Sequence, residues 1–227
     1  MTIALVIFDC DGVLVDSEPL AMRVLLRAMH EQGADVTPSD AYRNYLGRSL
    51  ASISESLRGS HGMPLRQPAL AAMRHDLYDL FRAELRPAPG LPGILERLGA
   101  AWCVASSSQP ERIRLSLEVT GLLPWFEPNI FSASMVENGK PAPDLFLLAA
   151  RSMRVEPARC LVVEDSPAGI AAARRAGMRV LAYAGGSHVG PAGLLPEIAR
   201  LAPDGIFDDM HALPDLVRSL RTEKKAD

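Results

Sequence analysis

The chain has 227 residues, of which 48% are hydrophobic and 22% are charged, and its formal net charge is −3. The length allows one large domain or two modest ones, and the composition is ordinary for a soluble globular enzyme. The slightly acidic balance gives no electrostatic reason to expect nucleic acid or an anionic membrane as a partner, and no apolar run is long enough to span a membrane.

The first predicted element is a strand over Ile3–Phe8, a short run rich in β-branched residues. Asp9 and Asp11 follow it directly and are separated by one residue. Loops at the carboxyl ends of strands line the ligand-binding crevice of open α/β sheets. Two carboxylates this close repel each other unless a cation or a shared proton lies between them. This position therefore predicts Mg²⁺ and acid–base chemistry.

The next 69 positions, residues 17–85, contain no predicted strand. Their capping and proline signals predict helices that begin near Ser17, Thr37, Ser49 and Gln67. Asp16 and Ser17 are expected to open the first of these helices rather than to act in catalysis. We expect residues 17–85 to form a small all-helical cap domain over the crevice. The catalytic core would then consist of residues 1–16 and 86–227.

Strands and helices alternate in the rest of the chain. The expected strands are Trp102–Ser106, Asn129–Ser132, Cys160–Val163, Arg179–Tyr183 and Gly205–Phe207. The expected helices are Leu91–Leu98, Pro110–Thr120, Asp144–Met153, Pro167–Ala176 and Leu213–Arg221. This alternation predicts an α/β fold with a doubly wound, parallel, Rossmann-like sheet.

The cysteines and histidines favour a reducing location and no zinc site. Cys10, Cys103 and Cys160 show no C-x-x-C spacing, and each lies in or next to a predicted buried strand. Free thiols of this kind fit the cytoplasm. The five histidines show neither H-x-H nor H-E-x-x-H spacing.

Polar residues follow several of the later strands. Ser106, Ser107 and Ser108 end the second strand, and Glu164 and Asp165 end the fourth. In isolation Ser106 could merely finish a strand, and Ser108 is expected to be a loop hydroxyl. A carboxylate nucleophile, a hydroxyl, an ammonium group and a second acidic pair would together suit phosphoryl transfer.

The ammonium group is expected from Lys140, on a loop between Gly139 and Pro141. Only three of the 24 basic residues are lysines, and the other two, Lys224 and Lys225, lie in the C-terminal tail. In a chain that otherwise uses arginine, a single compact cation on a loop indicates a specific requirement.

Four segments in this order carry a resemblance to a known family. They are Asp9-Cys10-Asp11-Gly12-Val13, Ser106, Lys140-Pro141-Ala142-Pro143-Asp144 and Glu164-Asp165-Ser166-Pro167-Ala168-Gly169-Ile170. The chain resembles the haloacid dehalogenase superfamily over essentially its whole length. The similarity is to the phosphatase and β-phosphoglucomutase-like branch, which carries a helical cap after the first strand.

The resemblance implies a role for each of these residues. Asp9 would be the nucleophile that forms an aspartyl-phosphate, and Asp11 the general acid and base. Ser106, Ser107 and Lys140 would hold the phosphate. The implied Mg²⁺ ligands are Asp9, the carbonyl of Asp11, Asp165 and, directly or through water, Glu164.

Hydrolysis is the favoured reaction within this family. Asp11 argues against a dehalogenase, whose similar loop lacks the second acid. Residues 17–85 contain no lysine, whereas the related phosphonate hydrolases and β-phosphoglucomutases use a cap lysine. We therefore expect a Mg²⁺-dependent phosphatase, with a sugar phosphomutase as the alternative. A non-catalytic ligand-binding regulator on the same fold is the further alternative.

The substrate is expected to be a small phosphorylated metabolite such as a sugar, sugar-acid or polyol phosphate. Glu18, just past the catalytic loop, could meet a hydroxyl or a cation, and Arg48 could hold a carboxylate or a second phosphate. Arg48 could equally be a surface arginine. Asn138, near Lys140, is a further candidate. The protein itself is expected to be a monomer or a small homo-oligomer.

Overall fold

The computed structural model describes residues 2–31, 33, 36–45 and 67–222. The predicted cap helix near Ser49 and the candidate residue Arg48 lie outside these ranges. None of the described helices is both long enough and apolar enough to cross a membrane. Cys10, Cys103 and Cys160 are free and buried, as the sequence predicts.

A six-stranded sheet forms the centre of the molecule, and all its neighbouring strands pair in parallel. The strand order is β3-β2-β1-β4-β5-β6. The strands are β1 (Leu5–Phe8), β2 (Ala101–Ser106), β3 (Ile130–Ser132), β4 (Cys160–Glu164), β5 (Arg179–Tyr183) and β6 (Gly205–Phe207). The predicted doubly wound α/β fold is confirmed, with all six strands in their predicted places.

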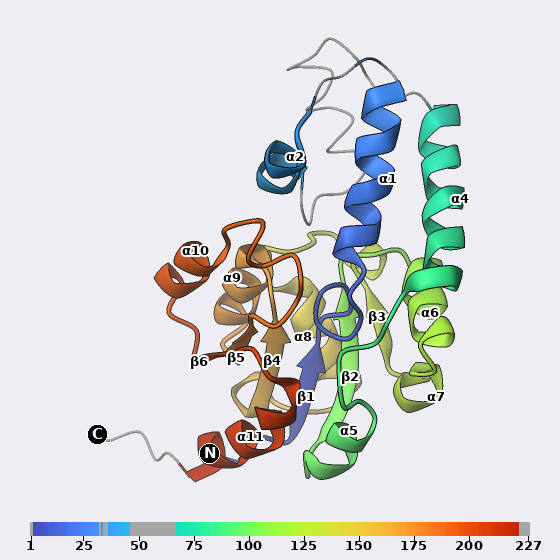
Figure 1. Cartoon of the computed structure of the whole chain (residues 1–227). Helices are drawn as coiled ribbons and strands as arrows, with labels where there is room; N and C mark the ends of the chain where they lie inside the picture. The colour runs from blue at the N-terminus through green and yellow to red at the C-terminus, as the bar shows by residue number, and fades with distance from the viewer. Residues whose placement is uncertain (1, 32, 34–35, 46–66, 223–227) are drawn as a thin grey trace.

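Helices cover both faces of the sheet (Figure 1). Side chains of β1 alternate between the faces, as they must in any strand. Val6 and Phe8 pack with α5 (Gly93–Arg97), α6 (Pro110–Val119), α7 (Leu123–Phe126) and α11 (Leu213–Thr222). Leu5 and Ile7 pack with α8 (Asp144–Ser152), α9 (Pro167–Arg175) and α10 (Leu195–Arg200). Because β1 is buried on both faces, its sequence is apolar throughout.

Two helices were absent from the prediction, α7 and α10. They have 4 and 6 residues, and each has a proline in its first turn. Elements of less than two turns are too short to show a helical period in the sequence. Three short 3₁₀ segments complete the described core: η1 (Ala133–Met135), η2 (Pro157–Arg159) and η3 (Met210–Ala212).

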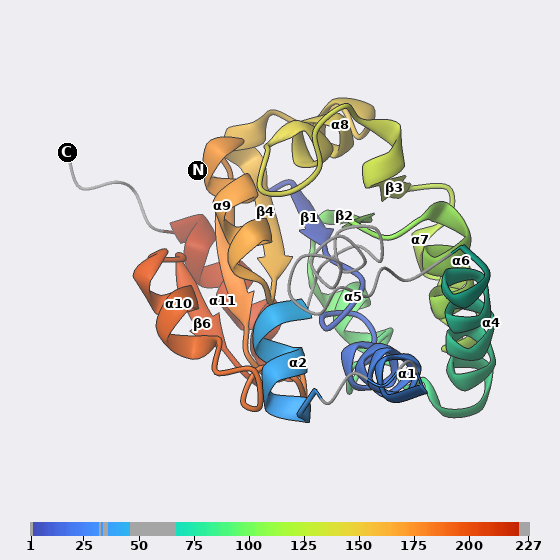
Figure 2. The same ribbon diagram turned by 90° about the horizontal axis from the view of Figure 1, so that it is seen from above.

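Three further helices lie beyond the carboxyl ends of the strands: α1 (Glu18–Glu31), α2 (Pro38–Tyr45) and α4 (Gln67–Glu84). In both ribbon views α1 and α4 run side by side (Figures 1 and 2). An exposed ion pair joins them, with Arg23 Nη1 2.5 Å from Glu84 Oε2. Their buried faces hold Val24 and Met73, which belong to the same hydrophobic cluster as Phe8 of β1.

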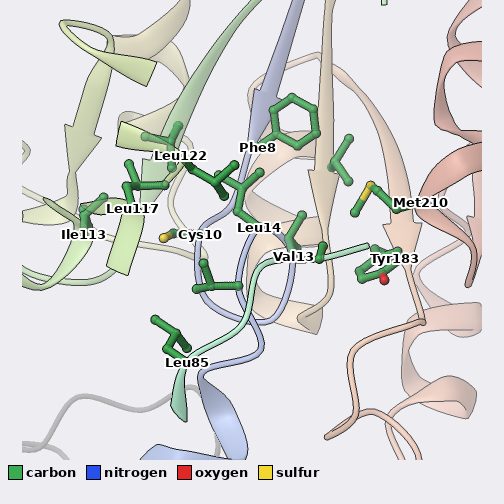
Figure 3. Packing of buried hydrophobic residues seen from close by; sticks show 14 of the residues in the cluster. Phe8, Cys10, Val13, Leu14, Leu85, Ile113, Leu117, Leu122, Tyr183 and Met210 are labelled. Atoms are coloured by element: carbon green, nitrogen blue, oxygen red, sulfur yellow. The ribbon is translucent and has the colours of Figure 1, made fainter. Parts of the chain in front are cut away.

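The loop after β1 joins this cluster to the helices above it. Val13 and Leu14 are at most 1% exposed. Figure 3 shows them between Phe8 and Leu85, the residue at which the chain returns from α4 toward the sheet. The backbone N–H of Ala88 donates to the carbonyl of Leu14 at 2.8 Å. The loop that carries Asp9 and Asp11 is therefore fixed by packing on both sides.

The packing against β1 predicts that truncating two different apolar side chains will lower the free energy of unfolding by very different amounts. Phe126 of α7 is fully buried, with its ring centroid 6.1 Å from that of Phe8 in an edge-on arrangement. Phe126→Ala should lower the free energy of unfolding by about 3–5 kcal/mol, because it leaves a cavity. Urea denaturation followed by circular dichroism measures this change.

The control is Leu195→Ala on α10, where the side chain is 46% exposed. It should cost less than about 1 kcal/mol, since little apolar area returns to water. Equal losses for the two variants would contradict the packing described here.

Candidate active site

The sheet brings the four sequence segments to one edge. Asp9 follows β1, Ser106 ends β2, Glu164 ends β4 and Asp165 follows it. Lys140 enters from the loop before α8. β1 and β4 are neighbours in the sheet. The chain continues from β1 to β2 on one side and from β4 to β5 on the other. This reversal of strand order is where α/β sheets leave a crevice for ligands.

Lys140 is the central contact of the site. Its Nζ donates to Asp9 Oδ1, to Glu164 Oε1 at 2.7 Å and to the carbonyl of Ala105 at 3.1 Å. The Lys140 side chain is only 4% exposed, and its ammonium lies 4.9 Å from the ring centroid of Phe146. One ammonium group therefore joins the ends of β1, β2 and β4.

Burial and the charge of the partner have opposite effects on the pKa values of Asp9 and Lys140. Burial raises the pKa of Asp9 well above its usual value, and the ammonium of Lys140 opposes this while Glu164 and Asp165 add to it. Burial alone would lower the pKa of Lys140, but Asp9 and Glu164 outweigh it and raise the pKa. Lys140 is therefore charged at any physiological pH.

Asp11 lies in a different environment from Asp9. Its Oδ1 accepts hydrogen bonds from Ser17 Oγ at 2.6 Å and Arg112 Nη2 at 2.7 Å, and its Oδ2 accepts one from Ser108 Oγ at 2.6 Å. Ser106 Oγ is 3.4 Å from Oδ2. Burial would raise the pKa of Asp11, but the guanidinium and the two hydroxyl donors outweigh it and hold the pKa below its usual value.

Arg112, Ser108 and Ser17 were not predicted as site residues. Arg112 belongs to the first turn of α6, which begins at Pro110, shortly after the serines that end β2. Because Arg112 follows the candidate phosphate-binding serines closely in the sequence, it could have been predicted as a site residue. Its guanidinium also lies 5.4 Å from the ring centroid of Phe81 on α4, so it connects Asp11 to a helix above the sheet.

Glu164 is occupied by contacts within the protein. Its Oε2 accepts from the backbone N–H groups of Asp165 and Ser166 at 3.0 and 2.9 Å, and from Ser166 Oγ at 2.9 Å. Ser166 also caps α9 by accepting from the N–H of Gly169. A side chain at position 169 would overlap the Glu164 carboxylate, so glycine is required there.

Asp165 lies between the loop that carries Asp9 and Asp11 and the loop after β5. It is 4% exposed, and its Oδ2 lies 2.9 Å from Nε2 of His188. Burial, Glu164 and Glu18 raise the pKa of Asp165 well above its usual value. Gly12 packs directly on it with φ of 84°, and a Cβ atom there would overlap Asp165 Oδ2.

The remaining candidates are placed less centrally. The side chains of Ser107 and Asn138 are exposed, and the amide of Asn138 donates to Asp144 Oδ1 at 3.2 Å. Glu18 is half-buried at the start of α1, where burial and Asp11 raise its pKa. Asp16 accepts from the side chain of Ser187 in the loop after β5.

The chemistry of these donors fits a divalent cation. Among the residues that the structure describes, the four carboxylates of Asp9, Asp11, Glu164 and Asp165 meet two buried or half-buried cations, Lys140 and Arg112. Burial first, and neighbouring carboxylates second, raise the pKa values of Asp9 and Asp165, so a bound cation would stabilise their ionised forms. Mg²⁺ prefers carboxylate oxygens. Within the described ranges, no three Asp, Glu, His or Cys side chains are already arranged as a metal cluster.

Comparison with known proteins agrees with this geometry. A model of the haloacid dehalogenase-like hydrolase family matches residues 3–177. The chain belongs to the haloacid dehalogenase-like hydrolase family. The match includes every segment named above except the loop after β5.

Two curated relatives in this family are bacterial phosphatases. The chain is 31% identical over 187 residues to 6-phosphogluconate phosphatase of Escherichia coli strain K12, covering 82% of this chain and 85% of that one. It is 32% identical over 184 residues to hexitol phosphatase A of the same organism, covering 78% and 81%.

Solved structures of family members share the fold. A haloacid dehalogenase-like protein of unknown function from Agrobacterium tumefaciens superposes with a TM-score of 0.83 at 32% identity, covering 95% of this chain and 98% of that one. A family hydrolase from Deinococcus radiodurans, solved with bound phosphate and sodium, gives 0.78 at 27% identity, covering 98% and 99%.

The contacts of Asp11 predict a pH-dependent loss of stability in Arg112→Leu. The two side chains are only 23% and 11% exposed, so removing the guanidinium should cost about 3–5 kcal/mol of unfolding free energy at pH 7. A pKa lowered by folding contributes stability that is lost as the pH falls through the folded-state value. The difference in unfolding free energy between variant and parent should therefore become smaller in acid. Urea denaturation from pH 7 to pH 3 measures it.

Arg114→Leu on the same helix is the matched control. Arg114 pairs with Glu127, but the two side chains are 51% and 44% exposed. An exposed pair of this kind contributes at most about 1 kcal/mol. If the difference in unfolding free energy between Arg112→Leu and the parent stayed constant with pH, the destabilisation would come from lost packing alone.

Proposed function

We propose that this protein is a Mg²⁺-dependent phosphatase that hydrolyses the phosphate ester of a small metabolite. The single observation that carries the proposal is the buried contact of Lys140 with both Asp9 and Glu164. It gathers a nucleophile, a phosphate-binding cation and an acidic pair from three separate segments. Phosphoryl transfer needs this combination, since catalysis consists mainly of positioning and charge stabilisation.

In the first half of the reaction, a carboxylate oxygen of Asp9 attacks phosphorus. The bond between phosphorus and the ester oxygen breaks, and Asp9 becomes an aspartyl-phosphate. Asp11, in its protonated form, gives its proton to the departing alkoxide. The contacts with Arg112, Ser17 and Ser108 favour the carboxylate at rest, so this proton is acquired at the expense of those contacts.

In the second half, water attacks the phosphorus of the aspartyl-phosphate. Asp11 is now the carboxylate, the form that its hydrogen bonds and Arg112 stabilise, and it takes a proton from the attacking water. The acyl-phosphate bond breaks, inorganic phosphate leaves and the carboxylate of Asp9 is restored.

The phosphate group would be held at the ends of β1 and β2. Lys140 would supply a fixed positive charge, and the Ser106 hydroxyl and the backbone N–H of Ser107, at the end of β2, would donate to the phosphate oxygens. We assign Asp9, Asp165 and the carbonyl of Asp11 as Mg²⁺ ligands. Bound Mg²⁺ neutralises negative charge on the transferring phosphoryl group. Since both oxygens of Glu164 accept hydrogen bonds within the protein, we propose that Glu164 orients Lys140 rather than binding the metal directly.

The substrate class follows from the relatives and the half-buried Glu18. The two relatives described above are named for a phosphorylated sugar acid and for hexitol phosphates. We propose a small polyhydroxylated phosphate ester, with Glu18 accepting from a substrate hydroxyl. Helices α1, α2 and α4 lie beyond the carboxyl ends of the strands (Figure 1), which supports division into a core (1–16 and 86–227) and a cap (17–85). The buried free thiols support a reducing, cytoplasmic compartment.

Phosphate release tests the proposed function directly. The full-length protein, assayed with Mg²⁺ on a panel of sugar, sugar-acid and polyol phosphates, should release inorganic phosphate from some members. Excess EDTA should abolish this release, and added Mg²⁺ should restore it. Interconversion of sugar phosphate isomers without phosphate release would favour the mutase. Binding of a panel member without any product would favour the non-catalytic regulator.

The assigned roles predict different losses for the two catalytic carboxylates. Asp9→Asn removes the nucleophile, so turnover should fall to background. Asp11→Asn should slow turnover by about 10²- to 10⁴-fold, the usual contribution of a general acid–base group. Steady-state phosphate release and trapping of the phospho-enzyme by mass spectrometry measure both effects.

Asp215→Asn is the control, because Asp215 lies on α11 with its side chain 77% exposed. It should retain the parent rate. If Asp9→Asn also kept that rate, the assignment of Asp9 as nucleophile would be wrong.

A further inference from the structure

We propose that His188 is a positioning residue for Asp165, and that it sets the orientation of this carboxylate for Mg²⁺. This inference rests on the proposed function, which makes Asp165 a metal ligand. His188 lies in the loop after β5, beyond the segment that the family model matches. Its role is assigned here from contacts alone.

The contact between His188 and Asp165 is short and inaccessible to water. Nε2 of His188 lies 2.9 Å from Oδ2 of Asp165, and the two side chains are 2% and 6% exposed. A polar contact between a ring nitrogen and a carboxylate is stronger when shielded from solvent, because the local dielectric is low and water does not compete for either atom. The imidazole therefore restricts the rotation of the Asp165 carboxylate.

The tautomer of His188 follows from its other nitrogen. Nδ1 is buried and has no hydrogen-bond partner in the part of the chain that the structure describes. In a neutral imidazole one nitrogen carries the proton and the other accepts. A proton on Nδ1 would have no acceptor, whereas Nε2 lies 2.9 Å from Oδ2 of Asp165. We therefore place the ring proton on Nε2, beside Oδ2, so that Oδ1 of Asp165 takes no part in this contact.

Backbone contacts hold the imidazole in this place. Gly12, from the catalytic loop, packs against both partners, and a Cβ atom there would lie 2.7 Å from Cε1 of His188. A Cβ atom at Gly186 would lie 2.6 Å from the same carbon. Ser187 donates to Asp16 at 2.9 and 2.8 Å, which ties the loop after β5 to the end of the catalytic loop.

These contacts give the loop after β5 a function in metal binding. A carboxylate ligand that is held by a buried polar neighbour loses less rotational freedom when it binds a cation. Removal of such a supporting partner typically weakens metal affinity by about 10- to 100-fold. His188 should thus affect the affinity for Mg²⁺, and leave the chemical step unchanged once Mg²⁺ is saturating.

The test is calorimetric titration of Mg²⁺ into the EDTA-stripped, full-length protein. His188→Gln places an amide near the Nε2 position, and His188→Asn places the same amide only near Nδ1, so the pair differs in reach and not in chemistry. We expect His188→Asn to bind Mg²⁺ about 10- to 100-fold more weakly than the parent. His188→Gln should stay close to the parent. His211→Asn, on the exposed η3 segment, controls for loss of a histidine elsewhere.

Activity on the best phosphate ester adds a second readout. In His188→Asn the Mg²⁺ concentration for half activation should rise, while kcat at saturating Mg²⁺ and the KM for the ester stay near parent values. Equal losses of Mg²⁺ affinity in the Gln and Asn variants would overturn the positioning role, as would parent-like affinity in His188→Asn. Circular dichroism verifies that each variant is folded.

Asp165→Asn separates failure of this inference from failure of the proposed function. If Asp165→Asn loses Mg²⁺ binding while His188→Asn keeps it, only the role of His188 is wrong. If Asp165→Asn keeps parent affinity, Asp165 is not a ligand, and both the metal assignment and the inference are overturned.

Discussion

A single buried ammonium group determines the arrangement of the site. Lys140 contacts Asp9 and Glu164 with its side chain 4% exposed, so each carboxylate offsets the burial of the cation and the cation offsets theirs. Without Lys140, Asp9 and Glu164 would be buried carboxylates that lack this cation, which costs several kcal/mol. Backbone pairing places β1 beside both β2 and β4, and Lys140 offsets the cost of burying two carboxylates at the ends of these strands.

The pKa values of Asp9 and Asp11 are shifted in opposite directions because their surroundings differ. Asp9 lies among acidic groups with one lysine, and burial raises its pKa. Asp11, two residues later, meets an arginine and two hydroxyl groups, which lower its pKa. Such opposite shifts assign different tasks to chemically identical groups. In the proposed mechanism, Asp11 would be kept as the base of the second half-reaction, while Asp9 would depend on Lys140 and a bound cation.

Much of the fold and the site could be predicted from the sequence. The apolar strands, separated by helical periods, indicated the sheet, and the polar residues at strand ends indicated Asp9, Lys140, Glu164 and Asp165. The scarcity of lysine singled out Lys140 before its contacts were known. α7 and α10 escaped prediction because four to six residues carry no helical period. Asn138, chosen for its nearness to Lys140 in sequence, donates to Asp144 at the surface, and its role toward substrate stays a prediction.

The sequence by itself determined the order of the elements and the chemical type of each group, because periodicity and composition are local properties. Tertiary structure alone decided which groups meet. Arg112 reaches Asp11 across 101 residues of sequence, and Lys140 reaches Asp9 across 131. His188 approaches Asp165 because glycines at positions 12 and 186 leave space for its ring. Such contacts depend on how helices and loops pack around the sheet, and no local pattern records that packing.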